Sequence, residues 1–183
     1  SIKLKAQVHA SAKNKKVDWT TWDRSVAKIS SSGKLTAAKD ITEETMTYVE
    51  CWPTGNNTVG FVKIPVIVKP RATNVHARMI TEDGTPFYVS NTTQTVGAWE
   101  GNRIEISALV YPFEARQDVT WKSNKTKIVK IVEEFDEETG KTRYFMEFTG
   151  KTGKVTITAT AKDGSKEKAT FTLNVVAPSP VVQ

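Results

Sequence analysis

The feature that most constrains this chain is a repeat of its own apolar pattern about a hundred residues further on. The segment at 2–30 aligns without a gap onto the segment at 104–132, at an offset of 102. This offset places Val17 on Val119 and Trp19 on Trp121, within a shared V-x-W pattern. A repeat of this length indicates two copies of one domain. We expect domains at residues 1–70 and 71–177, followed by a linker or tail at 178–183.

Beyond residue 30 the repeat continues, with changes of length in polar turns. KLTA falls on EFTG, with Leu35 on Phe148, so that the second copy carries 11 extra residues in the acidic stretch EEFDEETGKTR. VECWPTGN then falls on ITATAKDG at an offset of 108, which we expect to hold as far as Val68 and Val176.

Each copy has the pattern of a half-buried β-sheet. IKLKAQV, IEISALV, VTITATA and ATFTLNVV alternate apolar and polar residues and are rich in β-branched side chains. The turn sequences SSGK, PTGN, ETGK and KDGS separate such segments at short intervals, and no segment keeps helical spacing. The chain is therefore predicted to be all-β, as two sandwiches of antiparallel sheets.

Trp19 and Trp121 are predicted to lie in the two cores. Residues i and i+2 of a strand share a face, so each tryptophan points the same way as the valine before it. Burying an aromatic side chain removes roughly 150–250 Å² from water. We expect these indoles to carry much of the stability of each core.

Three further tryptophans have no counterpart in the other copy. Trp22 falls on Asn124, Trp52 falls on Thr160 with outward strand parity, and Trp99 precedes the first matched strand of the second copy. They are either rings lying over the edges of the sandwiches or exposed contacts for a partner. As exposed contacts, Trp22, Trp52 and Trp99 would form a ligand-binding platform for sugars.

The segment VDWTTWDRSVAKISSSGKLTA resembles the bacterial immunoglobulin-like domain, group 2. The resemblance rests on Trp19, Asp23, the Val26–Ala27 pair, Gly33 and LTA at 35–37, and in the second copy on the Asp163–Gly164 turn. It implies two tandem Ig-like Greek-key β-sandwich domains, at about 2–70 and 75–176. The family has no catalytic residues, so the resemblance implies a chain that is not an enzyme and has no cofactor.

About thirty residues precede the IEISALV strand of the second copy, whereas only Ser1 precedes Ile2. We therefore expect the first copy to lack its first strand and the chain to be a fragment of a longer protein. The junction around Pro70 and the segment APSPVVQ are expected to be stiff linkers to neighbouring modules.

Other chemistry has little support in the sequence. The net charge of +6 has only one basic cluster, KNKK at 13–16, which does not indicate a nucleic-acid site. Cys51 is expected to be a buried apolar residue, because His9 and His76 carry no motif for a catalytic base. The acidic run at 133–138 lacks calcium-loop spacing and is expected to be a hairpin tip. No metal site and no membrane insertion are predicted.

The sequence thus predicts a non-catalytic structural or adhesive module pair of a bacterial cell-surface or secreted protein, located outside the cell. A host-surface protein or a glycan is the expected partner, besides neighbouring modules of the same chain. A carbohydrate-binding accessory module and a phage tail or virion decoration domain are the alternatives.

Overall fold

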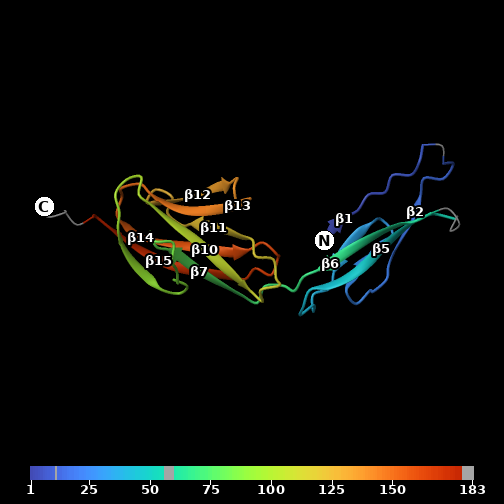
Figure 1. Cartoon of the computed structure of the whole chain (residues 1–183), viewed down its shortest axis with the longest axis horizontal. Coiled ribbons are helices and arrows are strands. Elements are labelled where there is room, and N and C mark those ends of the chain that lie inside the picture. The colour runs from blue at the N-terminus through green and yellow to red at the C-terminus, as the bar shows by residue number, and fades with distance from the viewer. Residues whose placement is uncertain (11, 56–59, 179–183) are drawn as a thin grey trace. The chain divides into compact units, whose positions relative to one another are not determined.

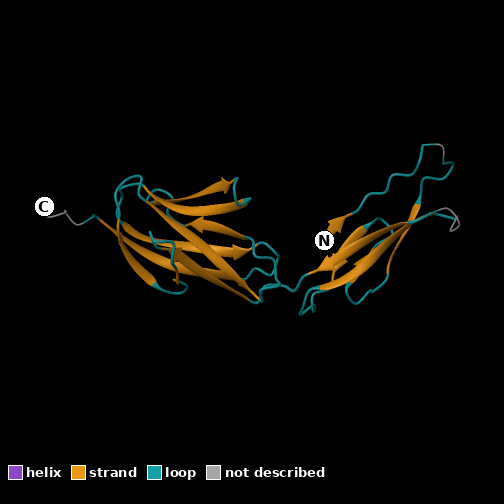
Figure 2. Cartoon of the chain, in the orientation of Figure 1, coloured by secondary structure: helices purple, strands orange, loops and turns teal. Residues whose placement is uncertain are grey.

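The structure, a computed structural model, describes residues 1–10, 12–55 and 60–178. Every regular element among these residues is a β-strand (Figure 2). The chain divides into two compact units, residues 1–71 and 72–183 (Figure 1). The prediction of an all-β chain is confirmed.

The second unit is a sandwich of two sheets. One sheet has the strand order β12-β13-β10-β7-β8, and the other has the order β11-β14-β15-β9. Paired strands are antiparallel, except that β9 runs parallel to β15. The strands are β7 (Asn74–Ile80), β8 (Pro86–Tyr88), β9 (Thr93–Gly97), β10 (Arg103–Tyr111), β11 (Val119–Ser123), β12 (Val129–Asp136), β13 (Lys141–Phe148), β14 (Gly153–Ala161) and β15 (Lys168–Val176).

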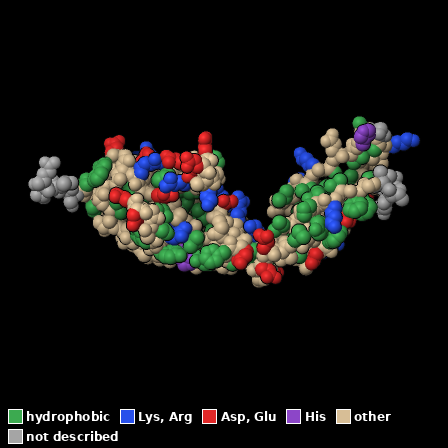
Figure 3. All heavy atoms as spheres, viewed as in Figure 1, with side chains coloured by type: hydrophobic (Ala, Val, Ile, Leu, Met, Phe, Trp, Pro, Cys, Tyr) green, Lys and Arg blue, Asp and Glu red, His purple; other side chains and the backbone are tan. Residues whose placement is uncertain are grey.

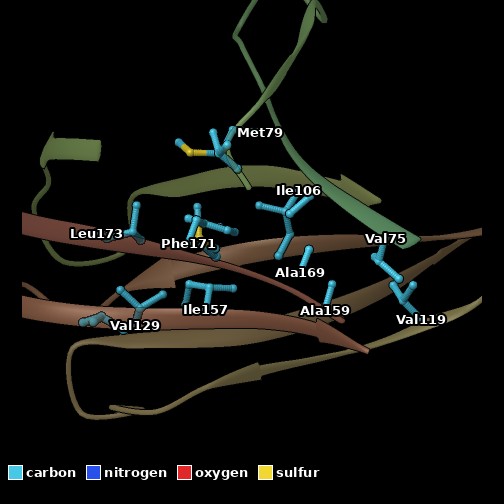
Figure 4. Packing of buried hydrophobic residues seen from close by; sticks show 14 of the residues in the cluster. Val75, Met79, Ile106, Val119, Val129, Ile157, Ala159, Ala169, Phe171 and Leu173 are labelled. Carbon is cyan, nitrogen blue, oxygen red and sulfur yellow. The ribbon is translucent and has the colours of Figure 1, made fainter. Parts of the chain in front are cut away.

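The core of the second unit lies between the inner faces of these two sheets. Residues at alternate strand positions point inward, so that β7, β10, β14 and β15 meet across the core (Figure 4). Phe148 and Phe171 are its largest fully buried side chains, each 1% exposed.

The first unit has the same strand order with fewer strands. Its sheets are β1-β4-β3 and β2-β5-β6, which correspond to β10-β13-β12 and β11-β14-β15. Among the residues described before Arg71, no strand takes the place of β7, β8 or β9. The strands are β1 (Ile2–Lys3), β2 (Val17–Thr21), β3 (Ala27–Ile29), β4 (Lys34–Ala37), β5 (Thr45–Pro53) and β6 (Val62–Val68).

Strand pairing corrects the alignment of β4 with β13. Ile29 pairs with Leu35 in the first unit, and Ile131 pairs with Met146 in the second. Leu35 therefore corresponds to Met146, at an offset of 111, and not to Phe148. The second copy carries nine extra residues here instead of eleven, and they lengthen the β12–β13 hairpin.

Strand pairing also corrects the alignment of β6 with β15. Val49 pairs with Ile64, and its counterpart Ile157 pairs with Phe171, which gives an offset of 107. Val68 therefore corresponds to the buried Val175 and not to the exposed Val176. A slip of one residue turns every side chain of a strand to the other face, so burial selects the corrected register.

Trp19 and Trp121 occupy corresponding places beside the two cores. Trp19 pairs with Cys51 and Trp121 with Ala159, and both indoles are partly buried against the core cluster of their own unit. Both indoles therefore pack on the cores as expected but keep part of their surface exposed, whereas Phe148 and Phe171 are the largest fully buried side chains of the second core.

Gly33 shapes the turn beneath Trp19. Its φ of +80° is a left-handed conformation that glycine adopts at low cost. A Cβ atom at this position would lie 2.7 Å from the carbonyl oxygen of Leu4 and 3.3 Å from Nε1 of Trp19. The SSGK turn therefore requires glycine, because the Leu4 backbone and the indole pack directly on it.

The predicted strand IKLKAQV forms only over Ile2–Lys3. The N–H of Leu4 donates to the carbonyl of Gly33, and no strand is formed from Leu4 to His9. The corresponding residues of β10 pair with β7 from Ile106 to Tyr111. Because the first unit has no described counterpart of β7, the alternating pattern lacks the partner that would make it a strand.

Asp163, in the Asp163–Gly164 turn, ties down the start of the second unit. Its carboxylate accepts hydrogen bonds from the backbone N–H of Ala72 and from both the N–H and the hydroxyl of Ser165. Burial raises the pKa of Asp163, but these hydrogen bonds outweigh it and leave the pKa below its ordinary value. The ionised form is therefore the one that stabilises the fold.

We expect Asp163→Asn to lower the stability of the second unit at neutral pH by about 1–3 kcal/mol, as loss of hydrogen bonds to a charged group does. Because the folded pKa is lowered, this contribution is present above the unfolded pKa of about 3.9 and is lost as the pH falls through the folded value. Urea denaturation of both proteins between neutral and acidic pH measures it. A difference that stays constant down to the lowest pH would contradict the role of the charge.

Candidate functional site

Partly buried and exposed aromatic side chains gather on the outer face of the β2-β5-β6 sheet. The backbone N–H of Trp22 donates to the carbonyl of Tyr48, and their ring centroids lie 4.8 Å apart. Nε1 of Trp22 donates to Oε1 of Glu50 at 2.7 Å. Nζ of Lys63 lies 3.5 Å from the Trp22 ring centroid and 3.9 Å from that of Tyr48. Lys63 therefore covers part of both rings by a cation–π contact.

Trp52 lies further along β5 on the same outer face. Its ring stacks on Phe61, with centroids 4.3 Å apart and an angle of 20° between the planes. The outward strand parity expected for Trp52 is confirmed, because Val49 and Cys51 are buried on the inner face. Phe61 covers one face of the Trp52 ring and is itself 45% exposed.

These six side chains form one surface, which we call the aromatic face: Trp22, Tyr48, Glu50, Trp52, Phe61 and Lys63. Met46 and Ile67, at the far end of the same sheet face, are 55% and 57% exposed. Apolar side chains are prominent on the visible surface of the first unit (Figure 3). An exposed apolar surface of this kind marks an interaction site more often than a surface of scattered apolar residues does.

Two of the three predicted ligand-binding tryptophans, Trp22 and Trp52, lie on one sheet face of the first unit. Trp22 lies beside Tyr48. Tyr48 and Trp52 are four residues apart on β5, a separation of roughly 13 Å along a strand. Trp99 belongs to the second unit, where it is 60% exposed in the turn before β10. The platform of Trp22, Trp52 and Trp99 remains a prediction.

Replacing Trp22 with alanine is expected to cost the first unit no more than about 1 kcal/mol, because its ring is 59% exposed. The substitution removes the hydrogen bond to Glu50 and the contact with Lys63, and both of these lie at the surface. Urea denaturation of the first unit measures the change. A loss above about 3 kcal/mol, the size of a buried aromatic truncation, would place Trp22 in the core.

A second aromatic cluster, on the outer face of the β7, β8 and β10 strands, was not predicted. His76 makes edge contacts with Tyr88 and Tyr111, at centroid distances of 5.8 and 5.3 Å, and Tyr111 lies 4.5 Å from Phe113. Tyr88 and Phe113 are 57% and 62% exposed. The outward parity of His76 in NVHARMI was visible, but nothing in the sequence indicated which strands would lie beside it.

Polar groups lie beside this cluster on the same sheet. Arg78 pairs with both Ser107 and Tyr88, and Nε of Arg78 and Oγ of Ser107 are buried without a hydrogen-bond partner among the described atoms. Burial, followed by a hydrogen bond with Tyr88, raises the pKa of the Tyr111 phenol above its ordinary value. Tyr111 therefore stays neutral at physiological pH.

The remaining candidates behave as surface or core groups. Cys51 is buried as expected, and burial followed by the charge of Asp18 raises the pKa of its thiol. Asp136 ends β12 and accepts hydrogen bonds from the N–H groups of Glu138 and Thr139, so the acidic run forms the predicted hairpin. Within the described ranges, no cluster of three or more His, Cys, Asp or Glu could hold a metal ion, and no helix could span a membrane.

The comparison with protein families gives a match within the second unit. Residues 84–171, from the β7–β8 turn into β15, match the family model of the bacterial Ig-like domain (group 2). This segment is a bacterial Ig-like domain. The resemblance inferred for the second copy from the Asp163–Gly164 turn is thereby confirmed. The first unit repeats the strand order of this domain, although its described residues form no counterpart of β7, β8 or β9.

Solved structures of low identity also match the chain. Domains 4 and 5 of the S-layer protein SbsC match at 15% identity, covering 96% of this chain and 80% of that one, with a TM-score of 0.34. A C-terminal fragment of intimin, in complex with the intimin-binding domain of its translocated receptor, matches at 16% identity over 89% and 51%, with a TM-score of 0.36. The chain spans about a fifth of the two longer SbsC structures, at 21% and 22%. Among curated proteins, none matches the chain.

Proposed function

We propose that the chain is a pair of structural and adhesive Ig-like modules, without catalytic activity, from a bacterial cell-surface or secreted protein. The observation that carries this proposal is the use of one sandwich plan twice, with a separate core in each unit. Repeated modules with separate cores extend a protein while each module folds by itself. The family match of residues 84–171 supports the bacterial, extracellular setting.

The adhesive part of the proposal rests on the aromatic face. Tryptophan and tyrosine offer a large rigid contact area and are enriched where proteins bind partners. Lys63 and Glu50 lie among the rings and offer a donor and an acceptor to a polar partner. A host-surface protein or glycan is the partner that this combination favours.

An adhesion assay with single-residue variants tests this role. Beads coated with the chain are passed over epithelial cells and over mucin, and the retained fraction is measured for the wild type and for Trp22→Ser. We expect the variant to fall to the level of uncoated beads. Trp99→Ser is the matched control, because Trp99 is equally exposed on the other unit. Equal retention of all three proteins on both surfaces would contradict adhesion through the aromatic face.

Carbohydrate binding is the second candidate, favoured by the presence of Trp22 and Trp52 on one sheet face. Indole rings stack against the apolar faces of sugar rings. Lys63 already covers part of the Trp22 ring, and Phe61 covers part of the Trp52 ring. A glycan array covering plant, mucin and bacterial-wall glycans tests it, with Trp52→Ala as the variant. Binding that Trp52→Ala removes supports a sugar site, and no binding to any glycan excludes this candidate.

A further inference from the structure

Two rings of the aromatic face form a corner that holds a cation. The ring centroids of Trp22 and Tyr48 lie 4.8 Å apart, with an angle of 54° between the planes. Nζ of Lys63 lies against both rings, 3.5 Å from one centroid and 3.9 Å from the other, where the negative faces of the rings attract it. The carboxylate of Glu50 accepts the hydrogen bond of the Trp22 indole and adds a negative charge beside the rings. The chemistry of this site, which we call the Trp22–Tyr48 corner, therefore selects a cation.

The second unit shows that the sandwich does not require these side chains. The strand pairing places short polar residues at the four corresponding positions, which are Asn124, Thr156, Thr158 and Thr170. The backbone hydrogen bond that joins Trp22 to Tyr48 is kept there, between Asn124 and Thr156. Since the same backbone forms without an aromatic or charged side chain, the fold does not explain why the first unit has them.

Lys63 is an occupant that a better cation can displace. Its side chain is exposed, and the Trp22 ring that it covers is itself 59% exposed. A primary ammonium group is strongly hydrated, so it loses part of its hydration when it meets a ring. A quaternary ammonium group has no N–H to hydrate and is the ligand that aromatic cages recognise in proteins. Such a group can bind the same two rings at a lower cost of desolvation.

We propose that the Trp22–Tyr48 corner binds the quaternary ammonium of a phosphocholine group, and that Lys63 then moves from the rings to the phosphate. The charges of the site match this zwitterion, because Glu50 attracts the ammonium end and Lys63 attracts the phosphate end. Choline alone gains only from the rings and Glu50. The inference rests on the proposed binding role of the aromatic face and names its ligand, a phosphocholine group carried by a glycan.

Titration of the full chain with phosphocholine, followed by the indole N–H signals in NMR spectra, tests the proposal. The chain has five tryptophans, and the signal of Trp22 is identified by its absence from Trp22→Ala. We expect phosphocholine to shift this signal in a saturable way and to leave the other four in place. The neutral analogue of choline, 3,3-dimethylbutanol, is the matched ligand and is expected to give no saturable shift. Equal shifts with both ligands, or no shift of Trp22 with phosphocholine, would overturn the proposal.

Lys63→Ala separates the two roles assigned to this lysine. The substitution removes the competing ammonium, so we expect choline to bind about two- to fivefold more tightly, as the loss of one exposed cation–π contact implies. It also removes the partner of the phosphate. The preference for phosphocholine over choline, expected to be about two- to fivefold in the wild type, should therefore disappear. An unchanged affinity for choline or an unchanged preference would contradict the exchange of partners.

Dextran carrying phosphocholine tests the carrier. We expect it to clump beads coated with the chain, and free phosphocholine to reverse the clumping. Clumping by vesicles of phosphatidylcholine without clumping by the dextran would overturn the glycan as carrier.

This inference and the proposed adhesion fail separately. Loss of bead retention in Trp22→Ser, without any shift of Trp22 by phosphocholine, would support adhesion and overturn the ligand. A saturable shift of Trp22 by phosphocholine, with full retention of Trp22→Ser beads on cells and mucin, would support the ligand and contradict adhesion through the aromatic face.

Discussion

Replacing Phe171 with alanine is expected to lower the free energy of unfolding of the second unit by about 3–5 kcal/mol. Phe171 is 1% exposed and lies on β15, between the two sheets of the larger core. Truncation removes its transfer free energy and leaves a cavity that the surrounding sheets cannot fully close. Urea denaturation of the full chain, monitored by hydrogen exchange of the β14 and β15 amides, measures the loss of unfolding free energy.

Phe135→Ala is the matched control for this experiment. Phe135 belongs to the same unit but is 66% exposed on β12. The free energy of unfolding of the second unit is expected to change by no more than about 0.5 kcal/mol, as it does for surface substitutions without special contacts. Losses of equal size at Phe171 and Phe135 would show that the second core does not lie between the sheets as described.

Replacing Trp19 with alanine is expected to unfold most of the first unit at room temperature. Among the described residues the buried apolar cluster there has five members, Val26, Ala27, Leu35, Val49 and Val68, and Trp19 packs against it. At 0.05–0.15 kcal/mol per residue, a unit of this length has roughly 4–10 kcal/mol of stability, and its small buried cluster favours the lower end. A loss of about 3 kcal/mol leaves little of it.

The measurement is native-state hydrogen exchange of β5 and β6 amides in the Trp19→Ala chain. We expect these amides to exchange at close to unfolded rates, while β14 and β15 stay protected. Trp22→Ala, three residues away and exposed, serves as the control and is expected to keep β5 and β6 protected. Full protection of β5 and β6 in the Trp19→Ala chain would mean that Trp19 contributes little to the first core.

The repeat predicted the two-layer architecture because apolar alternation fixes which side chains share a face. It could not fix every register. Placing Leu35 on Phe148 instead of Met146 shifts the strand by two residues, which preserves the face, so the pattern accepts both. Val175 and Val176 are identical neighbours, so the sequence could not show which of them is buried.

Two other features depend on partners that are distant in sequence. The segment from Leu4 to Val8 has a strand pattern but forms no strand, because a strand needs a neighbour to pair with. The parity of Trp52 was predictable from β5 alone. Its stacking on Phe61, and the position of Lys63 over Trp22, depend on the β5–β6 register. The repeat alignment placed β6 one residue out of register.

The central claim is that the chain folds twice on one β-sandwich plan around two separate cores. Residue-resolved hydrogen exchange at increasing urea, in the wild type and in Phe171→Ala, tests it most directly. We expect two sets of protected amides, one in β5 and β6 and one in β14 and β15, with only the second set losing protection in the variant. A single set that opens together, with equal loss in both halves of the chain, would contradict it.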